Sequence, residues 1–192
     1  MGDMDRKQIQ KAIERRLLED SVRGEFEATL VMRVERYLQV KPHGIVPNTH
    51  FSAPLAQCSF LYRDGHYYGC IALSQAVAEA LVKYMCKKKS CKAANSFEKN
   101  LGILASRGFL KDDLKTILLQ IWENRDDYHH LNPNVERDLS RLQEIALDKA
   151  SLLVKVMADI FEYSIIDGRF KPKHPEYWEI TGQKANVFLN FE

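Results

Sequence analysis

The chain has few cysteines, and their spacing is not typical of a metal site or a redox motif. Its 192 residues include four cysteines, at positions 58, 70, 86 and 91, and none of them forms a C-x-x-C pair. The six histidines do not join them at the spacing of metal ligands. We therefore expect no metal and no cofactor, and free thiols in a reducing, cytoplasmic environment.

Long apolar runs and a strong net charge are also missing. No run of 18 apolar residues occurs and no signal-peptide pattern opens the chain, so we expect no membrane association. The net charge of +2 does not by itself imply a nucleic-acid partner. Residues 83–115, however, carry nine Lys or Arg against three acids. This local excess makes Lys87, Lys88, Lys89 and Lys92 candidate RNA contacts, although such a run can also be a solvated helix end.

Convincing strand patterns are scarce, with residues 186–191 as a possible exception. Apolar residues instead recur at helical spacing over 4–39, 66–87, 97–107, 112–130 and 133–166. The pattern predicts an all-α fold, an up-and-down helical bundle of about four to six helices in a single domain, 1–192. Residues 40–65, which contain three of the six prolines, are expected to form a loop, and residues 167–192 a tail that packs as an arm or a short hairpin.

The segment 66–87 is apolar on nearly all sides, which is typical of a helix at the centre of a bundle. Two polar residues, Gln75 and Glu79, lie on one of its apolar stripes. Such positions either face a polar partner inside the bundle or belong to a solvated face. The sequence leaves both interpretations open.

A second notable segment begins at Asp112 and ends at Pro133. Its first half carries Leu114, Ile117, Leu118 and Ile121 on one helical stripe, and the next position of that stripe is Arg125. A guanidinium keeps its charge, so burying it without a partner is unfavourable. We therefore expect Arg125 to pair with a carboxylate, with Glu79 as the leading candidate, or to line a cleft.

Arg125 is followed by Asp126 and, a few residues later, by His129 and His130. A fixed cation with a titratable imidazole can support phosphate chemistry, because histidine exchanges a proton near neutral pH and arginine stabilises developing negative charge. The same residues are also common at helix ends, where they complement the helix dipole, and Asp126 could simply hold Arg125. On a regular helix His129 shares the face of Arg125, whereas His130 lies ~140° away and joins it only if the helix loosens.

Two segments together resemble HEPN (higher eukaryotes and prokaryotes nucleotide-binding) domains. Residues 64–83 look like the second helix of that family, with a short Asp-Gly start and an alanine-rich core around Gln75 and Glu79. Residues 125–130 resemble its motif of an arginine followed, four to six residues later, by a histidine. The resemblance covers roughly residues 64–166.

The resemblance implies a helical homodimer that cleaves RNA without metal, with Arg125 and His130 as catalytic residues and His129 in reserve. Gln75, Glu79 and Asp126 would support them. Some toxins of the family carry a tyrosine two residues after the histidine; Asn132 stands there in this chain. One hypothesis is therefore a toxin or phage-defence ribonuclease, with a possible cognate antitoxin or other protein partner. The alternative is a non-catalytic helical interaction or nucleotide-binding module.

Overall fold

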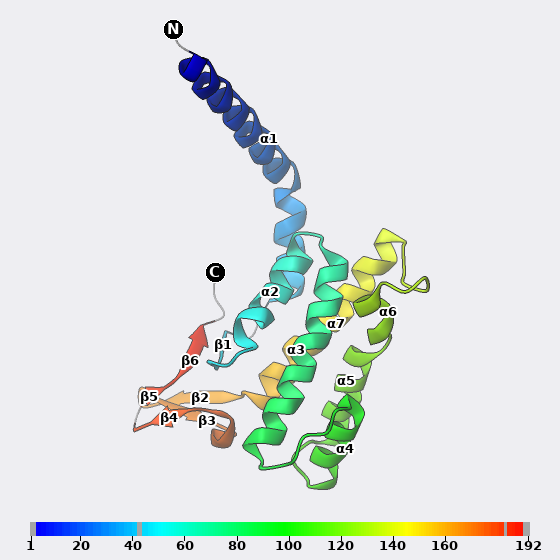
Figure 1. Cartoon of the computed structure of the whole chain (residues 1–192). Helices are drawn as coiled ribbons and strands as arrows, with labels where there is room; N and C mark the ends of the chain where they lie inside the picture. Colours follow the sequence, from blue (N-terminus) through cyan, green and yellow to red (C-terminus); the bar gives the residue numbers. More distant parts are fainter. Residues whose placement is uncertain (1–2, 42–43, 183, 190–192) are drawn as a thin grey trace.

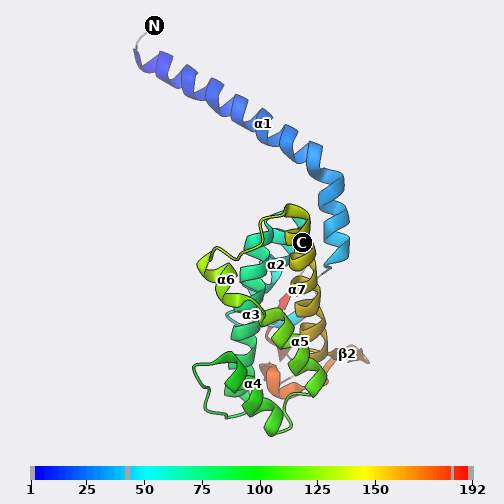
Figure 2. The same ribbon diagram turned by 90° about the vertical axis from the view of Figure 1, so that its right-hand side faces the viewer.

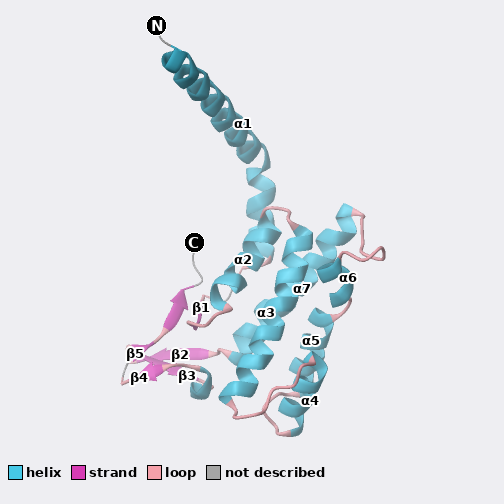
Figure 3. Ribbon diagram, viewed as in Figure 1, coloured by secondary structure: helices cyan, strands magenta, loops and turns pink. Residues whose placement is uncertain are grey.

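The computed structural model describes residues 3–41, 44–182 and 184–189, and it consists mostly of helices. A helical body carries one long helix that projects from it, and short strands lie at one side of the body (Figures 1 and 3). The helices are α1 (Asp3–Gln39), α2 (Ser52–Arg63), α3 (Tyr67–Lys88), α4 (Phe97–Ser106), α5 (Asp112–Trp122), α6 (Arg125–His130) and α7 (Leu139–Ile160), with a 3₁₀ turn η1 (Pro175–Tyr177). The helical class expected from the sequence is confirmed, whereas the assignment to a HEPN-like bundle remains a prediction.

Helix α3 is the centre of the body, as its apolar pattern predicts. It packs against α2, α7, α4, α5 and α6. Its side chains Ile71, Ala78, Leu81 and Val82 are completely buried. Because α3 contacts these five helices, the positions of α5 and α6 are set largely by the face of α3 on which each lies.

Helix α1 is one continuous helix. Figure 2 shows its first part pointing away from the body, with a bend before the part that approaches α2. From Arg6 to Ala28 the described side chains are exposed. Only the last turns pack on the body, where Val40 is buried just beyond the helix.

The sequence predicts that residues 40–65 form a loop. This prediction is wrong for the second half of the segment, which forms α2. This helix buries Leu55, Cys58, Ser59 and Tyr62, which are spaced i, i+3, i+4 and i+7. The stripe is hard to recognise because half of its members are polar or amphipathic. Pro54 fits because it lies in the first turn, where a missing N–H breaks few helical hydrogen bonds.

The helix expected to reach residue 166 ends at Ile160, and the remaining chain forms strand pairs. Strands β2 (Tyr163–Ile166) and β3 (Arg169–Pro172) make a hairpin whose turn, Asp167-Gly168, has positive φ angles of 52° and 70°. The other pairs are β4 (Ile180–Thr181) with β5 (Lys184–Ala185), and β1 (Ile45–Pro47) with β6 (Val187–Leu189). The strand suspected near residue 186 thus corresponds to β6, while residues 190–192 lie outside the described part.

Candidate functional site

The segment expected to be one helix from 112 to 130 is broken at Glu123 and Asn124. Helix α5 buries Leu114, Ile117, Leu118 and Ile121, so the predicted stripe is confirmed. Asn124 then adopts a left-handed conformation, with φ of 57°, and α6 starts in a new direction. Asparagine tolerates this conformation better than most residues. The break means that Arg125 does not continue the apolar stripe of α5.

The carbonyl groups at this break are held by two buried side chains from other helices. The Lys149 Nζ atom on α7 donates hydrogen bonds to the carbonyls of Gln120, Ile121 and Glu123, at 3.2, 2.9 and 2.9 Å. The Gln75 Nε2 atom on α3 donates to the Glu123 carbonyl at 3.0 Å. Helix ends leave such carbonyls without intrahelical partners, so these contacts fix where α5 ends and where α6 begins.

Lys149 was not among the candidates from the sequence, although a signal for it exists. It occupies a position on the stripe Leu142, Ala146, Lys149, Leu153, Val156 of α7, and only 6% of it is exposed. Burial lowers the pKa of its ammonium group to about 8, and the nearby carboxylates of Glu123 and Asp148 oppose that change. A lysine on a core stripe needs buried hydrogen-bond acceptors, because burying a charge without a partner is unfavourable. The same reasoning applies to Arg125.

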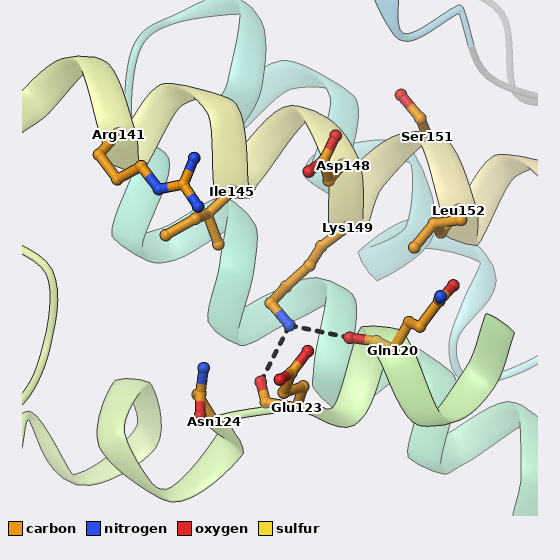
Figure 4. A pocket seen from close by; sticks show the side chains of 9 residues that line it. All are labelled: Gln120, Glu123, Asn124, Arg141, Ile145, Asp148, Lys149, Ser151 and Leu152. Carbon is orange, nitrogen blue, oxygen red and sulfur yellow. Dashed lines mark hydrogen bonds between the residues drawn. The ribbon is translucent and has the colours of Figure 1, made fainter. Parts of the chain in front are cut away.

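A cleft of about 530 Å³ lies beside the break, between α7 and the end of α5 (Figure 4). Its walls include Asn124 and Glu123 from the break, and Arg141, Asp148 and Lys149 from α7. Figure 4 shows the Lys149 side chain reaching across to the carbonyls of the break. The residues lining this cleft do not include Arg125, His129 or His130. The cleft therefore lies on one side of the helix break, and these three side chains of α6 are not part of it.

Arg125 is partly covered by its neighbours. Its Nη1 atom donates a hydrogen bond to Asp126 at 2.9 Å, and its guanidinium lies 5.4 Å from the ring centre of Trp122. That ring in turn stacks on Phe97. The side chain is 29% exposed, and its Nε atom is buried without a hydrogen-bond partner in the described part of the chain. Asp126 is 78% exposed, so it can rotate away when another anion approaches the guanidinium.

The expected ion pair between Arg125 and Glu79 is wrong. Glu79 instead accepts a hydrogen bond from Lys83, one turn further along α3, at 2.6 Å. The change of direction at Asn124 turns the guanidinium toward Trp122 and Asp126. Glu79 still lies close enough to His129 to affect the pKa of that imidazole.

This arrangement predicts that Glu79→Ala has only a small effect on stability. The Glu79–Lys83 pair joins residues four apart on a helix surface, and such pairs contribute about 0.5 kcal/mol. We expect a change of that size in the free energy of unfolding, measured by urea denaturation, and the same change for Lys83→Ala. A loss of 3 kcal/mol or more, the scale of a broken buried pair, would contradict the surface role.

His129, and not His130, accompanies Arg125. Helix α6 remains helical as far as His130, and the left-handed residue that ends it is Leu131, with φ of 50°. The loosening that would bring His130 to Arg125 is therefore absent from α6. His129 is half-buried against α3, one turn after Arg125, whereas His130 is exposed.

The surroundings of His129 favour its neutral form. Burial is the main cause that lowers the pKa of this imidazole, and the positive charge of Arg125 adds to it. The backbone of Ala72 and the carboxylate of Glu79 act in the opposite direction. Its Nε2 atom is buried without a hydrogen-bond partner in the described part of the chain. The neutral imidazole is the form of histidine that can accept a proton.

The depressed pKa of His129 predicts acid sensitivity. The folded protein binds a proton on His129 less readily than the unfolded chain does. The stability that this group contributes is therefore fully present above 6.5, the pKa of histidine in the unfolded chain. It is lost as the pH falls from there toward the lower pKa of the folded protein. Thermal melts of wild type and His129→Gln should therefore converge as pH decreases from 7 to 5. A constant difference over that range would show that the pKa of His129 is not depressed.

The candidate RNA-binding lysines lie at the end of α3 and just beyond it. Lys87 and Lys88 belong to its last turn, and 15 residues of helix, ~22 Å, separate Lys87 from Ala72, near which His129 packs. Lys89 pairs with Glu176 at 2.6 Å, and Lys88 lies over the Tyr84 ring. Of the four lysines, only Lys87 and Lys92 are exposed.

Among the residues that the structure describes, no group of three or more His, Cys, Asp or Glu side chains lies close enough together to hold a metal ion. No helix in the described part has the length and apolar character needed to cross a membrane.

Comparison with known proteins identifies no relative. No protein-family model matches the sequence, and neither a curated protein nor a solved structure matches the chain. The resemblance to HEPN domains therefore rests on residues 64–83 and 125–130 alone.

Proposed function

We propose that the protein is a metal-independent endoribonuclease of the HEPN type, in which Arg125 and His129 act together. The observation that carries this proposal is the pair itself. Arg125 and His129 lie one turn apart on the same side of α6, and the cation contributes to keeping the imidazole neutral. A neutral base beside a fixed cation is the combination that RNA cleavage by an internal hydroxyl requires.

The chemistry follows from these two groups. The neutral imidazole of His129 takes the proton of a 2′-hydroxyl, whose oxygen then forms a bond to the adjacent phosphorus. The guanidinium of Arg125 leaves Asp126 and donates hydrogen bonds to the phosphate oxygens, where negative charge develops. The bond from phosphorus to the 5′-oxygen breaks, and that oxygen takes a proton from water. The products are a 2′,3′-cyclic phosphate and a 5′-hydroxyl.

Three further expectations belong to this proposal. The exposed Lys87 and Lys92 bind the RNA backbone, so binding weakens with salt. The resemblance implies that a homodimer places the helix bearing Arg125 at its interface, which would bring basic and catalytic surfaces of two copies together. A role in a toxin or phage-defence system, with an antitoxin as partner, is the biological setting that the resemblance implies.

The test is incubation of purified protein with total RNA in EDTA, with Arg125→Ala as the matched variant. We expect wild type to shorten the RNA in EDTA and Arg125→Ala to leave it intact. Lys99→Ala, an exposed cation on α4, serves as the control for general loss of positive charge. Equal cleavage by wild type and Arg125→Ala would reject the proposal.

A second candidate, a non-catalytic interaction module, is favoured by one observation. Arg125 already has a carboxylate and an aromatic ring as partners, so its charge is satisfied without a ligand. If no RNA is cleaved, but the folded protein binds RNA or a nucleotide and Arg125→Ala binds it equally well, this second function replaces the first.

A further inference from the structure

Helix α1 carries a line of exposed apolar side chains at a spacing of four residues. Val22, Phe26, Leu30, Val34 and Leu38 are 58, 47, 43, 50 and 70% exposed. Residues spaced in this way form a single ridge that winds slowly around a helix. Scattered apolar side chains are common on protein surfaces, but a continuous apolar ridge marks an interaction surface.

The ridge borders a groove of about 240 Å³ between α1 and the end of α2. One side of the groove is lined by Phe26, Leu30 and Val34. The rest of the lining includes the aliphatic stems and guanidinium groups of Arg33 and Arg63. Arg33 also forms an ion pair with Asp64 at 2.6 Å, which fixes this wall of the groove. The groove therefore has an apolar floor and a basic edge.

We propose that this surface binds a second copy of the same chain, with the two α1 helices antiparallel and crossing at Leu30. Ridges of residues four apart interdigitate with ridges of the same kind, at a crossing angle of about −50°. A twofold axis at Leu30 places Phe26 of each copy against Val34 of the other. One ridge thus serves as both halves of the interface, which is the requirement for a symmetric dimer.

The distribution of charge favours the antiparallel direction. Residues 19–27 carry four acids and one base, whereas residues 33–41 carry three bases and one acid. An antiparallel pair centred on Leu30 places the acidic segment of each copy beside the basic segment of the other. A parallel pair would place like charges together, which is unfavourable. Because the acidic segment of one copy matches the basic segment of the other, a second copy fits this surface better than an uncharged apolar partner does.

The α1 interface shares no residue with α6, so it is an alternative to the dimer through α6 that the resemblance implies, and it is independent of the chemistry proposed for α6. Its first test is the mass of the full-length chain by light scattering and sedimentation at micromolar concentration. We expect a dimer for wild type and a dissociation constant raised about 30-fold or more for Leu30→Glu, the scale for a residue at the centre of an interface. Val31→Glu is the matched control, since Val31 is 70% exposed but lies off the ridge. A monomeric wild type, or a dimer that Leu30→Glu leaves unchanged, would overturn the proposal.

A second test locates the twofold axis without relying on affinity. The four native cysteines are buried, so an added surface cysteine is the accessible thiol. Leu30→Cys should form an intermolecular disulfide under mild oxidation, because the axis brings residue 30 of both copies together. Val31→Cys, about 100° around the helix, should not. Equal cross-linking of the two variants, or none by Leu30→Cys, would show that α1 does not pair in this way. Circular dichroism of each variant confirms that the helices are intact.

Discussion

His129→Ala is expected to reduce RNA cleavage by ~100-fold or more, the usual scale for loss of a general base, while His130→Ala retains most of the activity. The reason is the geometry of α6, which keeps His129 on the side of Arg125 and leaves His130 in solvent. The sequence motif alone favours His130. The helix favours His129, because the left-handed residue comes only at Leu131, after both histidines. Single-turnover cleavage of one RNA by the two variants measures the difference.

Both variants should keep the wild-type fold, since neither imidazole belongs to the buried core. His129→Gln provides a further comparison, because glutamine keeps an amide of similar size and cannot serve as a base near neutral pH. Loss of cleavage in His130→Ala, with activity retained in His129→Ala, would show that α6 rearranges when RNA binds. Normal cleavage in both variants would leave the second candidate function in place.

Lys149→Met should have the largest effect on stability, with a loss of ~3 kcal/mol in the free energy of unfolding. Methionine fills a similar volume, but it leaves the carbonyls of Gln120 and Ile121 without their donor. A buried acceptor that loses its partner costs about 1–3 kcal/mol, and Lys149 serves three of them. Removing the cost of burying an ammonium group offsets part of this loss, which is why the expected value is below the full sum.

Urea denaturation of Lys149→Met and Lys155→Met separates this effect from a general change of charge on α7. Lys155 is exposed on the same helix, so its replacement should change the free energy of unfolding by less than ~0.5 kcal/mol. Hydrogen exchange should also become faster across α6 in Lys149→Met, because the start of that helix loses its anchor. Equal stability of the two variants would mean that the carbonyls of the break find other donors.

The parts of the fold that depend on local periodicity were predictable from the sequence. The stripe of α5 and the central position of α3 follow from the spacing of apolar residues, and both are present. Helix α2 was missed because Ser59 and Tyr62 interrupt its apolar stripe. The end of α7 was misplaced because apolar residues continue into β2 without a change of composition.

The geometry of the candidate site could be predicted only in part. The sequence offers Arg125, Asp126, His129 and His130 as candidates, but their mutual arrangement depends on the break at Asn124. That break is held by Lys149, which is 25 residues further along the chain, and by Gln75, which is 49 residues earlier. Contacts between distant segments leave no local pattern. For this reason the sequence favours Glu79 as the partner of Arg125, whereas the carboxylate in contact is that of Asp126.

The most direct measurement is the chemistry of the RNA ends that wild-type protein produces in EDTA. The proposal predicts a 2′,3′-cyclic phosphate and a 5′-hydroxyl at each cut, and no cleavage where the nucleotide 5′ to the cut phosphate carries a 2′-deoxyribose. Arg125→Ala and His129→Ala should yield neither product above background. Ends with a 5′-phosphate, or cleavage that continues at the 2′-deoxy position, would contradict attack by the internal hydroxyl and with it the role assigned to His129.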